Sequence, residues 1–112
     1  MAGRDYLGEF EQVVLLALSR LGEAAYGGSI HREILDATGR DVSIPAVYVT
    51  LKRMEKKGLV VSSVGRGPSS GARATRNYEV LPDGEAALIR SRELLDRLWS
   101  GSTLLTPRGA KP

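Results

Sequence analysis

The sequence predicts a mainly α-helical (α+β) fold, because helical periodicity recurs in four segments and strand periodicity in only two. The helical segments are residues 8–21, 28–37, 43–57 and 82–99, and the strand segments are residues 59–64 and 75–81. A chain of 112 residues is long enough for one domain with a modest core. We therefore expect a single small domain of helices with one hairpin.

The composition excludes several functional classes. The chain has no cysteine, which removes disulfides, thiolate metal sites and cysteine nucleophiles, and His31 alone cannot build a histidine metal site. No apolar run approaches the ~18 residues of a membrane span, and no signal-peptide pattern opens the sequence. Catalysis would need a nucleophile and base or converging carboxylates, and the carboxylates here are scattered. We expect a cytoplasmic protein with no cofactor and no enzymatic activity.

The first helix, residues 8–21, is apolar on nearly all sides. One stripe runs along Phe10, Val14, Leu18 and Leu21, and the remaining residues of VVLLAL fill the other faces. A helix of this kind must be covered on more than one side. We expect the cover to come from a second subunit, and the alternative is complete burial within its own domain.

The second helix begins at Gly28 or Ser29, after a connector of residues 23–26, and ends at the stop of Thr38 and Gly39. Its inward residues are Ile30, Ile34 and Leu35. His31 falls on or beside the polar face, where we expect it to face solvent or to cap.

The third helix has clear start and stop signals. Ser43 is a good N-cap, Pro45 fits the first turn, and Gly58 follows two lysines. One face is apolar, with Val47, Leu51 and Met54. The opposite face is small, polar and basic, with Ala46, Val49, Thr50, Lys52, Arg53, Lys56 and Lys57. A DNA major groove can accept such a helix, although an ordinary amphipathic surface helix has the same pattern. With the preceding helix it forms a helix-turn-helix.

The two strand segments predict a hairpin with a long tip, GRGPSSGARA, at residues 65–74. A helix-turn-helix followed by such a hairpin is a winged helix-turn-helix with a two-stranded wing. Three arginines of the wing favour a phosphate or minor-groove contact over an inert connector: Arg66, Arg73 and Arg76. Residues 52–76 carry a net charge of +6, whereas the rest of the chain carries −3, which favours a polyanionic partner over a solvated charge run.

The last helix begins with Pro82 and two nearby acids, and has no later element to pack against. Its wide apolar face comprises Ala87, Leu88, Ser91, Leu94, Leu95, Leu98 and Trp99. This pattern predicts packing against a partner chain, antiparallel across a two-fold axis. The expected organisation is a DNA-binding domain at 1–81, a dimerisation helix at 82–99 and a disordered tail at 100–112.

The sequence resembles the PadR-like family of bacterial transcriptional regulators, in the subgroup with a short C-terminal helix. The matching motifs are Gly8-x-Phe10-Glu11, Ala25-Tyr26-Gly27, Gly39-Arg40-x-Val42-Ser43, Ala46-Val47-Tyr48-x-Thr50-Leu51-x-Arg53-Met54-Glu55-x-Lys57-Gly58-Leu59 and Gly71-x-Arg73-x-x-Arg76-x-Tyr78. The resemblance implies a winged-helix homodimer with a C-terminal dimerisation helix that represses a nearby operon.

The predicted function is sequence-specific binding of double-stranded DNA, with the third helix in the major groove. Its predicted DNA-binding residues are Ser43, Pro45, Ala46, Tyr48, Thr50, Lys52, Arg53 and Lys56, with Lys52, Arg53 and Lys56 as phosphate anchors. For Tyr48, core packing is an equal alternative. The predicted dimerisation residues are Phe10, Val14, Leu88, Leu95, Leu98 and Trp99.

Two questions stay open at this point. A small apolar effector could bind between the first and last helices, near Phe10, Val14, Leu95 or Trp99, or these residues could be dimer core only. A winged-helix adaptor that binds protein instead of DNA is the alternative function, but it has no need of the basic segment.

Overall fold

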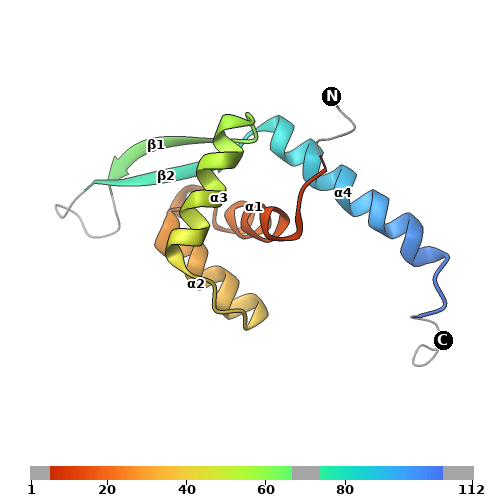
Figure 1. Ribbon diagram of the computed structural model, residues 1–112. Helices are drawn as coiled ribbons and strands as arrows, with labels where there is room; N and C mark the ends of the chain where they lie inside the picture. The colour runs from red at the N-terminus through yellow and green to blue at the C-terminus, as the bar shows by residue number, and fades with distance from the viewer. Residues whose placement is uncertain (1–5, 67–73, 105–112) are drawn as a thin grey trace.

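The computed structural model describes residues 6–66 and 74–104. Within them the order of elements is α1 (Glu9–Leu21), the 3₁₀ turn η2 (Gly22–Ala24), α2 (Gly27–Thr38), α3 (Ile44–Lys56), β1 (Val60–Arg66), β2 (Ala74–Val80) and α4 (Pro82–Ser100) (Figure 1). This arrangement confirms the predicted fold class, a winged helix-turn-helix followed by a C-terminal helix.

The helix ends lie within a residue or two of those predicted from glycines and caps. Gly39 closes α2 with φ 78°, and Gly58 follows α3 with φ 77°, in the left-handed region that glycine adopts at little cost. At the start of α3 the Ser43 Oγ accepts a hydrogen bond from the Ala46 N–H at 3.1 Å. These signals are local, which is why the sequence revealed them.

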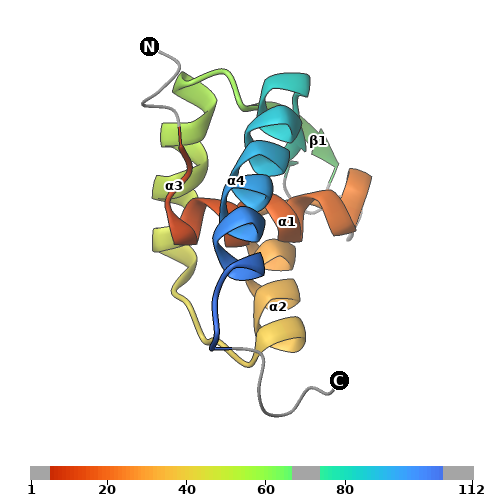
Figure 2. The ribbon, with the colours of Figure 1, turned by 90° about the vertical axis from the view of Figure 1, so that its right-hand side faces the viewer.

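The three N-terminal helices form the body, with α1 at its centre, and the wing and α4 leave the body in opposite directions (Figures 1 and 2). β1 and β2 pair antiparallel, from Val60 opposite Val80 to Arg66 opposite Ala74. The wing is attached to the body by a hydrogen bond from the Tyr78 N–H to the Ala25 carbonyl at 2.9 Å. The hairpin therefore extends the body beside α3.

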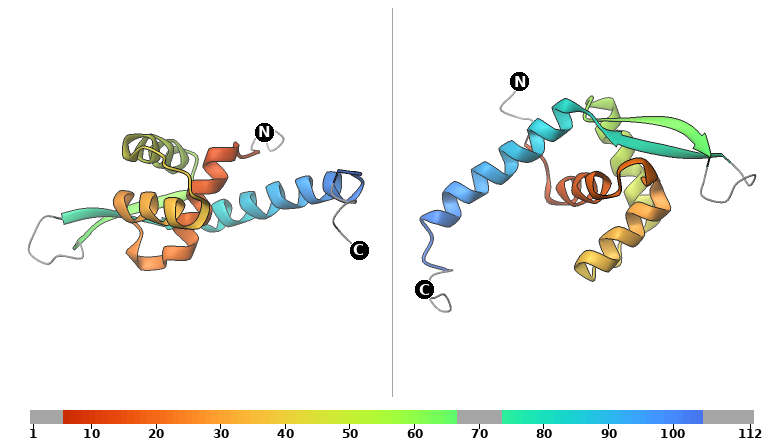
Figure 3. Two further views of the ribbon diagram at one scale, coloured as in Figure 1. Left: turned by 90° about the horizontal axis from the view of Figure 1, so that it is seen from below. Right: turned by 180° about the vertical axis from the view of Figure 1, so that it is seen from behind.

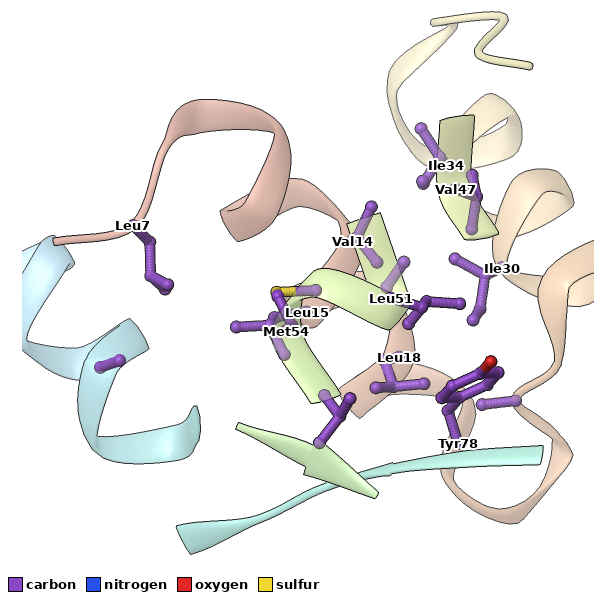
Figure 4. Packing of buried hydrophobic residues seen from close by; sticks show 14 residues of the cluster. Leu7, Val14, Leu15, Leu18, Ile30, Ile34, Val47, Leu51, Met54 and Tyr78 are labelled. Carbon is purple, nitrogen blue, oxygen red and sulfur yellow. The ribbon is translucent and has the colours of Figure 1, made fainter. Parts of the chain in front are cut away.

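The core is built around α1, whose Val14, Leu15 and Leu18 are almost fully buried (Figure 4). Side chains of α2, α3 and β2 surround them, including Ile30 and Tyr78. The expectation that a second subunit covers α1 is therefore wrong for most of this helix, because the rest of the chain covers it. Among the apolar side chains of α1 the exposed exception is Leu16, at 51%.

α4 has two unlike halves. In the first half Gly84, Ala87 and Ser91 are buried, and a Cβ at Gly84 would overlap the Leu59 carbonyl oxygen, so the helix approaches β1 closely. From Arg92 onward every residue of α4 is exposed, and this half extends away from the body (Figure 3). Residues 101–104 form a turn against the end of α4, with the Ser102 N–H bonded to the Trp99 carbonyl at 3.0 Å. The rest of the predicted tail, 105–112, lies outside the described residues.

Candidate nucleic-acid interface

The outer face of α3 is the most basic surface of the helix-turn-helix. Lys52, Arg53 and Lys56 are all exposed on it, and Lys57, the C-cap, is exposed just beyond. Pro45 and Val49 lie on the same face as Lys52 and Lys56, because these positions are three or four residues apart. Ser43 is exposed at the start of the helix, but its hydroxyl oxygen already accepts the capping hydrogen bond.

Of the residues predicted on the outer face of α3, Val49 lies there and Thr50 does not. Thr50 is only 3% exposed and lies with the buried residues of α3, whereas Val49 is 60% exposed. The Thr50 side chain is therefore not available on the outer face, and Val49 is. The sequence carries a signal for this, since Thr50 is three residues from Val47 and four from Met54, in the buried row of the helix, whereas Val49 lies in one row with Pro45 and Lys52.

Tyr48 packs against the start of α2. It is half-buried, and a Cβ on Gly27 would overlap its ring. Gly27 is thus needed for the close approach of the two helices. Tyr48 therefore takes part in core packing, and its proposed phosphate contact stays a prediction.

One flank of α3 is joined to the start of α1 by a buried carboxylate. The Glu11 Oε2 atom accepts from the Arg53 Nε and the Lys57 Nζ, each at 3.3 Å. The other oxygen, Oε1, accepts from the Gly8 N–H at 2.9 Å. Arg53 and Lys57 thus lie over a carboxylate that is contributed by the centre of the fold.

The environment of Glu11 lowers the pKa of its carboxyl group. Burial alone would raise this pKa, but the Gly8 N–H and the two cations favour the ionised form and together outweigh the burial. The carboxylate is therefore charged at neutral pH.

The other flank of α3 is joined to the wing. The Glu55 Oε2 atom accepts from the Ser62 hydroxyl at 2.8 Å and from the Ser62 N–H at 3.2 Å. The Ser62 hydroxyl oxygen in turn accepts from the Arg76 Nη1 at 3.0 Å. Arg76 is exposed on β2, so this chain of hydrogen bonds fixes a wing arginine relative to α3.

The other two predicted wing arginines cannot be placed. Arg73 lies outside the described residues, and for Arg66 only the backbone, in β1, is described.

The turn between α2 and α3 also rests on α1. The Arg40 Nη1 pairs with the Glu9 Oε2 at 2.7 Å, and its guanidinium lies 5.6 Å from the centre of the Phe10 ring. His31 is half-buried, with its Nε2 3.5 Å from the Asp41 Oδ1. His31 was expected to face solvent or to cap. It is partly exposed, and it also lies against the turn between α2 and α3.

A cavity of about 580 Å³ lies between α1 and α4. Its lining comprises Gln12, Leu16, Ser19, Val80, Glu85, Leu88, Ile89, Arg92, Leu95, Asp96 and Trp99. Three of the predicted dimer or effector residues, Leu88, Leu95 and Trp99, are therefore brought together here. Val14 is instead fully buried in the core, and Phe10 lies under Arg40, away from this cavity.

The described residues contain no group of three or more histidine, cysteine or acidic side chains placed to hold a metal ion. In the same part of the chain, none of the helices has the length and apolar character that crossing a membrane requires.

Solved structures of transcriptional regulators share this fold. A PadR-family regulator from Eggerthella lenta is 27% identical, with a TM-score of 0.66 over 85% of this chain and 82% of that one. The fold is that of a PadR-like winged-helix protein. A PadR-like regulator from Bacillus cereus has a TM-score of 0.71 at 18% identity, covering 88% of this chain and 92% of that one. A PadR-family regulator from Clostridium difficile has a TM-score of 0.65 at 20% identity, covering 81% and 92%.

No protein-family model matches the chain, and neither does a curated protein. The likeness to PadR-like regulators thus rests on the solved structures and confirms the resemblance found in the sequence motifs.

Proposed function

We propose that this protein is a sequence-specific DNA-binding transcriptional regulator, a repressor that binds a pseudo-palindromic operator as a homodimer. The observation that carries the proposal is the exposed basic face of α3, in a fold shared with transcriptional regulators. Val49 and Pro45 would meet base edges and Lys52 and Lys56 would neutralise phosphates, while Arg76 holds the wing on the adjacent backbone.

The apolar face of the second half of α4 supports the homodimer. Leu95, Leu98 and Trp99 are exposed, and a contiguous apolar surface of this kind is typical of an interface. Leu16 and Ile89 extend it across α1 and the middle of α4. A second copy related by a two-fold axis would cover this surface and present two α3 helices, so half-sites should lie about one helical turn apart.

A small apolar effector would bind in the cavity between α1 and α4. Its volume, about 580 Å³, falls within the range typical of ligand sites. The leucines, Ile89 and Trp99 of the lining suit a largely apolar ligand, and Trp99 would report its binding through fluorescence, since this is the one tryptophan of the chain. Release of the repressor would follow if the ligand changed the spacing of the two α3 helices.

The test is DNA binding by the purified protein to its own upstream region at two salt concentrations. We expect binding that survives excess competitor DNA and weakens on the order of 10³-fold over a fourfold rise in salt. Footprinting then locates the half-sites. Binding that competitor removes completely would contradict an operator-specific role, and no binding at low salt would favour a protein–protein adaptor.

A further inference from the structure

Arg53 lies over Glu11 in an asymmetric arrangement. The Glu11 side chain is 9% exposed, whereas the Arg53 side chain is 50% exposed. The carboxylate therefore lies beneath the guanidinium, and the guanidinium forms part of the molecular surface. Within the described residues, Arg53 donates one hydrogen bond, from its Nε atom to Glu11.

A guanidinium that is held through Nε retains four N–H donors on its two Nη atoms. These donors lie in one plane and match the oxygens of a phosphate group. Because one edge of the plane is fixed by the carboxylate, the direction of the other edges is fixed as well. A lysine held in the same way would remain a point charge without direction.

Glu11 is itself rigidly placed. Its Oε1 atom is bonded to the Gly8 N–H, and it belongs to the first turn of α1, the most buried helix of the fold. Lys57 shares the Oε2 atom, so two cations balance one carboxylate and the cluster keeps a net positive charge. A buried acid in this place therefore does not cancel the basic surface above it.

We propose that Glu11 is a positioning residue, which orients the Arg53 guanidinium so that it binds one DNA phosphate and fixes the register of α3 on the operator. The inference rests on the proposed function, since it needs an operator complex. It predicts an effect opposite in sign to simple electrostatics, because removal of a negative charge near DNA would by itself strengthen binding.

The variant Glu11→Gln tests this directly. The glutamine Oε1 can still accept from the Gly8 N–H, while its NH₂ group replaces Oε2 and confronts the donors of Arg53 and Lys57. We expect about ten-fold weaker binding to the operator, with competitor DNA bound as tightly as before or more tightly. Tighter binding to both DNAs would overturn the inference and make Glu11 a simple electrostatic brake.

Two controls separate positioning from charge and from stability. Glu9→Gln removes the same charge from the same turn of α1 but touches only Arg40, so operator affinity should change less than three-fold. In an Arg53→Ala background, Glu11→Gln should no longer weaken operator binding. An undiminished loss in that background would overturn the inference, because Glu11 would then act without Arg53.

Arg53→Lys serves if Glu11→Gln does not fold. It keeps the charge on an exposed side chain, so we expect unchanged competitor binding and about ten-fold weaker operator binding. Operator binding at the wild-type level would overturn the inference. The Arg53 Nε–H resonance in the free wild-type protein should also be protected from exchange, and fast exchange would count against the pair.

Operator binding by the wild-type protein distinguishes failure of the proposed function from failure of the inference about Glu11. If it fails to bind its operator, the proposed function fails and the inference fails with it. If wild-type binding is specific and the Glu11 and Arg53 variants match it, only the inference fails.

Discussion

The exposed faces of α3 and of the second half of α4 differ in chemistry, although each belongs to a helix anchored in the same core. α3 presents Lys52 and Lys56 to solvent, whereas α4 presents Leu98 and Trp99. A basic face gains from contact with a polyanion, and an apolar face gains from removal from water. The difference teaches that one small fold carries two chemically distinct exposed surfaces, and if they bind DNA and a second copy as proposed, different substitutions should disable each.

The largest effect should come from breaking the anchor of α4. Gly84→Ala would stabilise an isolated helix by up to about 1 kcal/mol, but here the new Cβ overlaps the Leu59 carbonyl oxygen. Since backbone cannot move aside cheaply, we expect a net loss of about 3 kcal/mol in the free energy of unfolding, measured by urea denaturation. Gly101→Ala is the control, because a Cβ there meets open space. Equal stability of the two variants would contradict the close approach.

The second largest effect should come from the apolar face of α4. Leu98 is 69% exposed, so Leu98→Asp should leave the fold intact and weaken self-association about 100-fold or more. Sedimentation velocity measures the association, and the Trp99 emission should shift to longer wavelength as the dimer separates. Arg97→Ala, on the polar side of the same turn, should change association little. A monomeric wild-type protein would refute the use of this face for dimerisation.

The sequence predicts the exposed face of α4 better than the exposed face of α3. Helix and strand ends were predicted to within one or two residues, because glycines, prolines and caps act locally, as at Ser43 and Gly58. The apolar face of α4 was also predicted, since a run of apolar residues at helical spacing is a local pattern. What a pattern does not give is the rotation of α3 against its neighbours, and so Thr50 was assigned outward although it is buried.

Contacts between distant segments were likewise out of reach. Glu11 and Arg53 are 42 residues apart, so no local pattern pairs the phosphate anchor predicted at Arg53 with a carboxylate of the first helix. Only the packing of α1 against α3 brings them together and buries the carboxylate. The same packing covers Val14 completely, which removes it from the predicted dimerisation residues. The sequence therefore predicts the elements and the chemistry of each face, but not the connections between them.

A smaller effect should come from the basic face of α3. Lys52→Ala and Lys56→Ala should each weaken binding to all DNA sequences by a similar factor, a few-fold at moderate salt, because phosphate contacts carry no base identity. Each should reduce the slope of log affinity against log salt by about 2 per dimer, since two contacts are lost. Filter binding over a salt series measures this. The control is Arg97→Ala, which lies on α4 and should leave the slope unchanged. A sequence-selective loss, as proposed for the oriented guanidinium of Arg53, would contradict a simple anchor role for these two lysines.

The smallest expected effect is a pH dependence of stability, which involves Glu11 beneath α3 and does not involve the anchor of α4. The pKa of Glu11 lies below its ordinary value because the Gly8 N–H, Arg53 and Lys57 outweigh the cost of burial. The unfolded chain therefore binds a proton at a higher pH than the folded chain, and stability falls as pH falls. The contribution of Glu11 is complete above the ordinary pKa of a glutamate, about 4.3, and is lost as the pH passes below the pKa in the folded state.

Wild-type protein should thus exceed Glu11→Gln in stability at pH 7, and the difference should shrink at pH 3, when measured by urea denaturation in buffers of equal ionic strength. Glu9→Gln is the control, because its stability shows the effect of losing an exposed carboxylate from the same turn of α1. A difference that persists unchanged at pH 3 would mean that the glutamine disturbs packing and that no charge interaction was lost. The first half of α4 is instead held by the close approach of Gly84 to the Leu59 carbonyl and by the burial of Ala87, and neither residue titrates. Acid should therefore loosen α3 from α1 through Glu11 while the first half of α4 stays attached.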